Sequence, residues 1–315
     1  MNMEKYQQKT IKHEISCVGV GLHTGEKITM VMKPADIDTG IVFHRTDKDG
    51  HDAYIPARHE NVVDTRMCTC VGTNDGVRVA TIEHLMAAIH ASGISNLEID
   101  VDGPETPVMD GSSAAFVFLL ECAGVKVQNA PRKALRMLKP VSVQNGDKDV
   151  SLSPAESGLT MRFSIDFPAA AIGHQEVGLS LTRANFKNMF CRARTFGFLK
   201  DIEALRAIGL ARGGSLDNAI LVDGDKIVNK DGLRYKDEFV RHKMLDAVGD
   251  LYMTGMPLIA EFSGNRSGHA DTHALLEAVL SDKSAYEIVD LPSYMAALEQ
   301  QKAAETDDDS AFLCA

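Results

Sequence analysis

The stretch that decides the fold covers residues 239–250 and reads Phe-Val-Arg-His-Lys-Met-Leu-Asp-Ala-Val-Gly-Asp. In a helix, His242, Asp246 and Asp250 recur every four residues and form one polar stripe. The neighbouring stripe is apolar and should face a core. It consists of Met244, Ala247, Val248 and Leu251. An imidazole and a carboxylate one turn apart can reach one ion, and zinc accepts both ligands. The alternative is an ordinary amphipathic helix with a capping or salt-bridging histidine.

Length and composition limit the classes of function. A chain of 315 residues is typical of about two domains, and its 44 % hydrophobic residues can build sizeable cores. The net charge of −11 argues against non-specific binding to nucleic acid or anionic lipid, which needs clustered lysine and arginine. We see no signal peptide in residues 1–13 and no apolar run long enough to span a membrane. We therefore expect a cytoplasmic protein that is not a membrane protein.

The cysteines also favour a reducing compartment. The six are scattered at positions 17, 68, 70, 122, 191 and 314. They are few for the length, which is typical of free thiols. Cys68-Thr69-Cys70 resembles a ligand pair, but zinc ribbons need two Cys-x-x-Cys pairs. We therefore expect Cys68 to pack in a core or in the wall of a pocket.

The two halves of the chain share one order of elements: strands, a helix with a histidine near its start, a strand and a second helix. In the first half we expect strands at 11–18, 27–34, 40–45 and 96–101, and helices at 79–93 and 110–124. Thr81 is the expected N-cap of the first helix and Gly93 its C-terminal residue. In the second half we expect strands at 135–143, 150–152, 159–167, 219–222 and 257–262, and helices at 201–208, 239–250 and 272–280.

This order predicts an α+β fold of two related β/α layered domains. They would pack face to face with the helices between them and the active site at their junction. The polar, proline-containing segment 128–132 marks the boundary, giving an N-terminal domain 1–127 and a C-terminal domain 133–300. The acidic tail, 301–315, is expected to be disordered.

A third ligand would turn the polar stripe into a catalytic metal site. His84 lies in the first turn of the helix predicted at 79–93, and could join His242 and Asp246. Two imidazoles and one carboxylate leave the fourth tetrahedral position open, as in catalytic zinc sites. Glu83, beside His84, could act as general base and be kept ionised by the helix N-terminus. It could also be an N-terminal helix charge with no further role.

Further polar residues could complete the chemistry. His269 lies in a glycine-containing loop and could be a general acid if a carboxylate such as Asp250 keeps it protonated. It could also be a histidine near a helix start without a catalytic part. Lys243 and Thr195 could stabilise an oxyanion, or be a solvated lysine and a plain strand residue. These residues alone predict a metal-dependent hydrolase.

Seven motifs resemble, in chain order, those of the UDP-3-O-acyl-N-acetylglucosamine deacetylase family, the zinc enzymes of lipid A synthesis in Gram-negative bacteria. They lie at 19–25, 81–85, 109–112, 192–198, 231–234, 239–250 and 267–269. The resemblance implies hydrolysis of the N-acetyl group of UDP-3-O-acyl-N-acetylglucosamine. This reaction releases acetate and UDP-3-O-acyl-glucosamine and is the committed step of lipid A synthesis.

The resemblance also implies roles for single residues. His84, His242 and Asp246 would bind one zinc ion per chain, and such a site also accepts iron. Glu83 would be the general base and His269 the general acid. Asp250 would orient the acid. Lys243 and Thr195 would contact the substrate or stabilise the oxyanion.

The family holds the 3-O-acyl chain in an apolar passage formed by an insert in the second domain, which matches about residues 196–222 here. The candidates for lining this passage are Leu199, Ile202, Leu205 and Leu221. Leu22, Cys68 and Phe196 are further candidates for contact with the substrate. Ile202 and Leu205 could equally belong to a small core. Phe167, Lys148 and Arg266 match positions that hold the UDP group, and basic side chains suit a diphosphate.

The match is poor at 168–180 and 281–315, and His273 is an extra histidine near His269. In some relatives an apolar C-terminal tail is recognised by a membrane protease, and residues 312–315 could serve likewise. Two other hypotheses stay open: a zinc amidase for another acylated amino sugar or peptide, and a metal-stabilised binding protein, which would need four protein ligands. The acyl length, the native metal and the oligomeric state cannot be deduced from the sequence.

Overall fold

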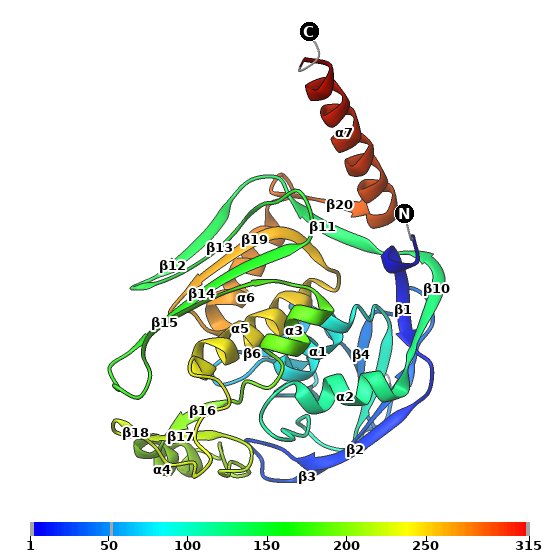
Figure 1. Ribbon diagram of the computed structural model, residues 1–315. Helices are drawn as coiled ribbons and strands as arrows, with labels where there is room; N and C mark the ends of the chain where they lie inside the picture. Colours follow the sequence, from blue (N-terminus) through cyan, green and yellow to red (C-terminus); the bar gives the residue numbers. More distant parts are fainter. Residues whose placement is uncertain (1–2, 51–52, 313–315) are drawn as a thin grey trace.

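The computed structural model describes residues 3–50 and 53–312. Two β-sheets enclose a layer of helices (Figure 1). The first sheet has the strand order β2-β3-β9-β4-β5. Its strands are β2 Ile15–Val20, β3 Lys27–Pro34, β4 Ile41–Arg45, β5 Tyr54–Pro56 and β9 Leu97–Val101.

The second sheet belongs to the C-terminal half and has seven strands. They are β11 Lys133–Met137, β12 Val141–Asn145, β13 Lys148–Pro154, β14 Leu159–Phe167, β15 Gly173–Ser180, β19 Leu258–Asn265 and β20 Tyr286–Asp290. Along β14 the side chains alternate between buried and exposed, as expected for a sheet with one face on a core.

The two sheets are built alike. In the first sheet the central strand β9 pairs antiparallel with β3, and in the second sheet the central strand β19 pairs antiparallel with β13. On its other side β9 pairs parallel with β4, and β19 pairs parallel with β14. The edge strands β5 and β15 then pair antiparallel with β4 and β14. The orders β2-β3-β9-β4-β5 and β12-β13-β19-β14-β15 are therefore equivalent, and β11 and β20 extend the second sheet. The predicted α+β fold of two related layers is confirmed.

Most of the helices lie between the sheets, whereas α4 lies beside a small separate sheet and α7 points away from the body (Figure 1). The helices are α1 Glu83–Ser92, α2 Ala114–Ala123, α3 Arg183–Met189, α4 Leu199–Ala207, α5 Glu238–Leu251, α6 His269–Ser281 and α7 Leu291–Phe312. All ten residues of α1 are buried, which explains why its sequence has no polar face. α5 packs beside α1, and Gly249 makes a close approach possible. A Cβ atom on Gly249 would lie 2.1 Å from the carbonyl oxygen of Glu83.

Smaller elements surround this body. Strands β6 Val62–Asp64, β7 Cys70–Gly72 and β8 Arg78–Val79 form one small sheet, and β1 Gln7–Ile11 pairs with β10 Val125–Pro131. Strands β16 Phe196–Phe198, β17 Ile220–Asp223 and β18 Lys226–Ile227 form another small sheet next to α4. This region covers the span predicted as the insert, 196–222, and continues to Ile227; it lies at the lower left of Figure 1. Among the described residues, short 3₁₀ helices cover Met3–Tyr6, His59–Asn61 and Tyr252–Thr254.

Some local predictions were wrong. Thr81 is not the N-cap of α1: its φ is 57° and its hydroxyl donates to Glu105, while Ile82 precedes the helix without a side-chain cap. The strand expected over 135–143 is two strands, β11 and β12. His269 begins α6 instead of lying in a loop before it.

The predicted boundary segment, 128–132, is largely strand β10, because β1 offers it a partner. The tail expected to be disordered is helical as far as Phe312, since its alanine, glutamate and glutamine residues favour a helix. This helix, α7, projects away from the body (Figure 1). Of the proposed protease signal, residues 313–315 lie outside the described residues. No helix in the described part of the chain is long and apolar enough to cross a membrane.

Candidate active site

Two histidines and one aspartate converge where α1 and α5 meet. His84 is the second residue of α1, and His242 and Asp246 lie one turn apart on α5. The Nε2 atoms of His242 and His84 lie 3.3 and 3.6 Å from Oδ1 of Asp246. All three side chains are buried. The structure thus brings together the three residues predicted as metal ligands.

The donor atoms of this group fit a bound cation. Nδ1 of His242 donates to the carbonyl oxygen of Ala193 at 3.0 Å, which leaves the lone pair of Nε2 directed at Asp246. Among the described residues, Oδ1 of Asp246 is buried without a hydrogen-bond partner, and Nε2 of each histidine faces it. The lone pairs of two imidazoles and a carboxylate repel one another at such short distances. A divalent metal ion among them would turn this repulsion into coordination.

The protonation states agree with ligand roles. Burial, and then the neighbouring His242, lower the pKa of His84 to about 3, so its ring is neutral. Burial also lowers the pKa of His242. For Asp246 burial opposes ionisation, but His242 and Lys243 hold its pKa well below the usual range. Two neutral imidazoles and an ionised carboxylate are the forms in which these side chains bind metals.

A second group of polar residues adjoins the metal ligands. Nδ1 of His269 lies 2.7 Å from Oδ2 of Asp250 on α5, and Nε2 of His269 lies 4.0 Å from Oε1 of Glu83. Thr69 joins the two carboxylates: its hydroxyl donates to Oδ1 of Asp250 at 2.6 Å, and its backbone N–H donates to Oε2 of Glu83 at 2.9 Å. The sequence analysis missed Thr69, since nothing in its neighbourhood marks it.

The pKa values of this second group move in a direction that suits acid–base chemistry. Burial alone would lower the pKa of His269, but Asp250, together with Glu83 and Asp246, raises it to about 9. Burial raises the pKa of Glu83 to about 8, and the negative charges of Asp246 and Asp250 add to this effect. A cation held by the neighbouring ligands would favour ionised Glu83. With Glu83 ionised and His269 protonated, one side chain can accept a proton and the other can donate one.

The catalytic cavity, as we call it, has a volume of about 280 Å³. It is lined by the metal-ligand group, by Glu83 and His269, and by Leu22, Lys148, Thr195, Phe196 and Lys243. Nζ of Lys243 lies 3.4 Å from Oδ2 of Asp246. The backbone N–H of Thr195 donates to the carbonyl oxygen of Gly111, which fixes the segment that presents its side chain.

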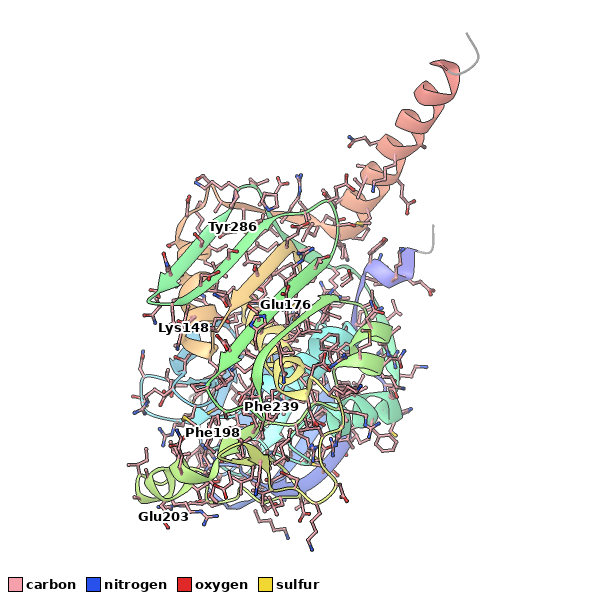
Figure 2. The ribbon with its side chains drawn as sticks, turned by 60° about the vertical axis from the view of Figure 1, so that its left-hand side comes forward. Lys148, Glu176, Phe198, Glu203, Phe239 and Tyr286 are labelled. Carbon is pink, nitrogen blue, oxygen red and sulfur yellow. The ribbon has the colours of Figure 1, made fainter. Side chains whose placement is uncertain are left out.

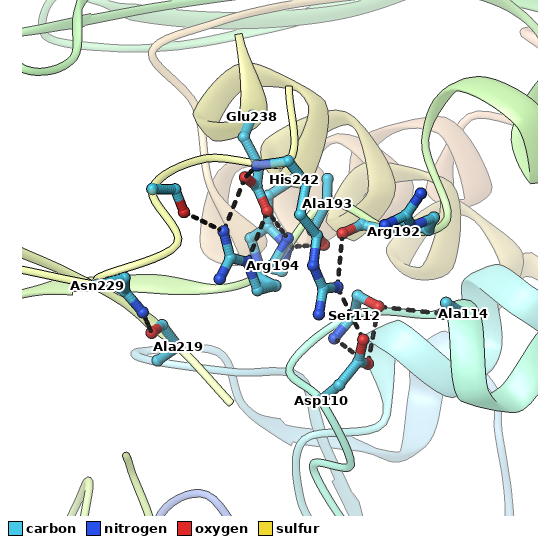
Figure 3. Close-up of polar contacts among 12 residues, drawn as sticks. Asp110, Ser112, Ala114, Arg192, Ala193, Arg194, Ala219, Asn229, Glu238 and His242 are labelled. Atoms are coloured by element: carbon cyan, nitrogen blue, oxygen red, sulfur yellow. Dashed lines mark hydrogen bonds and ion pairs between the residues drawn. The ribbon is translucent and has the colours of Figure 1, made fainter. Parts of the chain in front are cut away.

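A buried ion pair holds the segment that accepts a hydrogen bond from His242 (Figure 3). Arg194 and Glu238 are both nearly inaccessible, and Nε of Arg194 donates to Oε1 of Glu238 at 2.9 Å. Glu238 also accepts from the backbone N–H groups of Arg194 and Arg234. This pair anchors the segment whose Ala193 carbonyl accepts the hydrogen bond from His242. The sequence analysis did not single out either partner of the pair.

Of the three residues predicted to contact UDP, one lines the catalytic cavity and two do not. Lys148 lines the catalytic cavity and lies at the turn between β12 and β13, as Figure 2 shows. Phe167 does not line the cavity, and its ring packs on Phe196 and Phe198. Arg266 does not line it either, and pairs with Asp147 at 2.6 Å and with Asp166. His273 also lies outside this cavity, with its ring 5.9 Å from that of His59.

A more apolar cavity of about 580 Å³ adjoins the first, and Arg66 and Met67 line both. We call it the insert cavity because one side of it is formed by Leu205 of α4 and by Ile208, which directly follows this helix. Cys68 lies in its wall, as expected for a pocket residue. Ile202 is half-buried on α4 but does not line it, and the predicted lining residues Leu199 and Leu221 do not line it either. Figure 2 shows the insert, marked by Phe198 and Glu203, beyond the end of the second sheet where Lys148 lies.

Comparison with known proteins identifies relatives that cover nearly the whole chain. A family model described as UDP-3-O-acyl N-acetylglycosamine deacetylase matches residues 8–281. The chain is 50 % identical to the UDP-3-O-acyl-N-acetylglucosamine deacetylase of Acidithiobacillus ferrooxidans, over 90 % of this chain and 93 % of that protein. It is 46 % identical to the enzyme of that name from Actinobacillus pleuropneumoniae, with the same two shares. The enzyme of Shewanella oneidensis is 47 % identical, over 90 % of this chain and 92 % of its own.

Proposed function

Since the chain belongs to the UDP-3-O-acyl N-acetylglycosamine deacetylase family, we propose that it removes the N-acetyl group from UDP-3-O-acyl-N-acetylglucosamine by zinc-dependent hydrolysis. The products are acetate and UDP-3-O-acyl-glucosamine, and the reaction is the committed step of lipid A synthesis. One observation carries the proposal: the donor atoms of His84, His242 and Asp246 converge beside Glu83 and His269 in a single cavity.

Zinc is the proposed metal because two imidazoles and one carboxylate are the ligand set of an open catalytic zinc site. Held by His84, His242 and Asp246, zinc would act as a Lewis acid on the amide carbonyl and would lower the pKa of a water molecule bound to it. A metal-stabilised binding protein would instead need a closed site. The described residues offer three ligands to this group.

Glu83 and His269 divide the proton transfers between them. Glu83 takes a proton from the attacking water as a new C–O bond forms at the acetyl carbon. His269 gives its proton to the nitrogen as the C–N bond breaks, so the products are acetate and a free amine. Asp250 binds Nδ1 of His269, which leaves Nε2 as the nitrogen that faces Glu83 and the cavity. Lys243 and Thr195 line the same cavity, where an ammonium and a hydroxyl stabilise negative charge on the carbonyl oxygen.

The two adjoining cavities suit the two ends of the substrate. The insert cavity accepts the 3-O-acyl chain, with Leu205 and Cys68 in its wall. Leu22 and Phe196 line the catalytic cavity, where the sugar would lie. Lys148 also lines this cavity, and it is the residue predicted to meet the diphosphate. Phe167 and Arg266 remain predicted UDP contacts, and Arg266 would have to exchange its carboxylate partners for phosphate.

The test is acetate release from UDP-3-O-acyl-N-acetylglucosamine by the Glu83→Gln variant, with metal content measured on the same sample. We expect the rate to fall by roughly 10²–10⁴, the usual contribution of a general base, while the metal stays bound. Glu176→Gln is the matched control, because Glu176 is exposed on β15 and lines neither the catalytic cavity nor the insert cavity. A Glu83→Gln variant that keeps the parent rate would overturn the assignment. If the parent protein binds zinc but cleaves only other N-acetylated compounds, the substrate assignment is wrong and the amidase hypothesis stands.

A further inference from the structure

A separate cavity lies beyond the C-terminal ends of α1 and α5, whereas the metal ligands lie at the start of α1 and in the middle of α5. We call it the rear cavity, and it has a volume of about 310 Å³. Ser95 and Asn96 line it just beyond the end of α1, and Tyr252 and Gly255 line it just beyond the end of α5. It shares no lining residue with the catalytic cavity or the insert cavity.

The rear cavity is positively charged although the chain carries a net charge of −11. Arg58, Arg132 and Lys133 line it, against a single carboxylate, Asp38, which accepts a hydrogen bond from Gln8. Within the described residues, none of the three cations forms an ion pair. Elsewhere on this acidic chain, arginines such as Arg45, Arg194 and Arg266 do pair with carboxylates. Unpaired cations in a concave site attract anions.

Donors in the rear cavity also lack acceptors. Nε of Arg132 and Oγ of Ser95 are buried without a hydrogen-bond partner among the described residues. The side chain of Arg132 donates a long hydrogen bond of 3.4 Å from Nη2 to the hydroxyl of Tyr252. A buried donor without an acceptor destabilises the folded protein, so such atoms are rare unless something binds to them.

Helix ends explain part of this charge but not all of it. The C-terminus of a helix carries partial negative charge and attracts cations. Gly93 and Gly255 end α1 and the 3₁₀ turn after α5 with φ of 71° and 75°, and leave room for the arginines. A Cβ on Gly93 would lie 3.5 Å from Nη1 of Arg132, and one on Gly255 would lie 3.0 Å from Nη1 of Arg58. Neither guanidinium donates to a helix carbonyl within the described residues, so their donors remain available to a ligand.

We propose that the rear cavity binds the phosphate group of a small phosphorylated molecule. Two guanidinium groups present planar pairs of donors that match phosphate oxygens, and Ser95 and Lys133 add a hydroxyl and an ammonium. The cavity also has apolar walls, from Met256, Pro257 and Ile288, which suit a small organic part next to the phosphate. The site is distinct from the one proposed for the diphosphate of the substrate, and does not depend on that assignment.

The test is thermal unfolding of the full chain at increasing concentrations of inorganic phosphate, with chloride at matched ionic strength. Phosphate strengthens apolar burial in any protein, so the informative quantity is the difference between variants. We expect a saturable rise in Tm of the parent, because a ligand that binds the folded state stabilises it. Arg58→Gln and Arg132→Gln should each reduce the saturable part, and the double variant should abolish it.

Two control variants make the result specific. Arg162→Gln removes an exposed arginine of β14 that lies outside the cavity, and should keep the whole phosphate effect. Lys148→Gln should keep it as well, which excludes binding in the catalytic cavity. A rise in Tm that does not saturate, or that the double Arg58/Arg132 variant retains, would overturn the proposal. Circular dichroism in chloride shows whether each variant is folded. If Arg132→Gln does not fold, Arg58→Gln alone decides the outcome.

Discussion

The hydroxyl of Thr69 donates to Oδ1 of Asp250 at 2.6 Å, and this bond links the loop before β7 to the helix that carries the metal ligands. The backbone N–H of the same residue donates to Glu83 at 2.9 Å. One residue therefore fixes both the proposed base and the carboxylate that orients the proposed acid, His269. We regard Thr69 as a positioning residue, because it acts through these neighbours.

Thr69→Val should lower kcat by about tenfold. The change removes the hydroxyl but keeps the shape of the side chain and the backbone N–H that Glu83 accepts from. A net hydrogen bond to a charged group is worth about 1.5–3 kcal/mol, and we expect about half of it to appear in the rate. Steady-state kinetics checks this, with metal content as the structural control. Thr69→Ser retains the hydroxyl and should restore most of the rate. Equal rates for Thr69→Val and the parent would exclude the positioning role.

Asp250→Asn should change the pH dependence of the reaction. His269 must be protonated to act as acid, and its pKa is raised to about 9, so the rate of the parent should fall as the pH rises through about 9. Without the charge of Asp250, burial dominates and the pKa of His269 falls toward or below its ordinary value of about 6.5. The alkaline limb of the pH–kcat profile should therefore move to lower pH. An unmoved limb would show that another group controls it.

Gly249→Ala should destabilise the fold and weaken metal binding. Helix propensity alone predicts that alanine would stabilise the helix by about 1 kcal/mol. The new Cβ, however, would lie 2.1 Å from the carbonyl oxygen of Glu83, a backbone atom, so α1 and α5 must separate. Overpacking of this kind is destabilising by roughly 1–3 kcal/mol, which outweighs the propensity. Urea unfolding and zinc titration measure the two effects.

Gly178→Ala is the control for that experiment, since the nearest atom to its Cβ would be 3.7 Å away. It should leave metal affinity unchanged. If Gly249→Ala is as stable as the parent and binds zinc equally well, the close approach of the two helices has no role in forming the site.

Leu205→Trp should reduce binding of the acyl chain. Leu205 lines the insert cavity, and a larger side chain there takes up space that the chain needs. We expect KM for the 3-O-acyl substrate to rise by roughly tenfold or more, equivalent to the 1–3 kcal/mol of an overpacked site. The rate with a substrate that lacks the acyl chain should not change. Leu199→Trp, on the exposed side of α4, is the matched control. A similar KM for all three proteins would place the acyl chain elsewhere.

The metal group could be predicted from the sequence because its geometry is local. His242 and Asp246 lie one helical turn apart on α5, and the spacing alone puts them on one face. The repeated order of elements predicted that the helix with His84 would meet the helix with His242. Strand pairing confirms the equivalence of the two layers, because β9 and β19 have the same neighbours in the same directions.

Features that depend on distant contacts could not be predicted. Thr69 is important only because Glu83 and Asp250, far apart in sequence, both reach it. Gly249 appears in the sequence as a weak point of a helix, and only the approach of α1 explains it. Threonine is a typical N-cap residue, but the hydroxyl of Thr81 donates its hydrogen bond to the buried carboxylate of Glu105.

The most direct test of the account is acetate release from UDP-3-O-acyl-N-acetylglucosamine, measured with metal content on the same sample before and after treatment with a chelator. The account predicts that release stops when the metal is removed and returns when one equivalent of zinc is added. The Asp246→Asn variant should bind zinc weakly and stay inactive. Undiminished release from metal-free protein would contradict the account, as would a folded, zinc-loaded sample that releases no acetate.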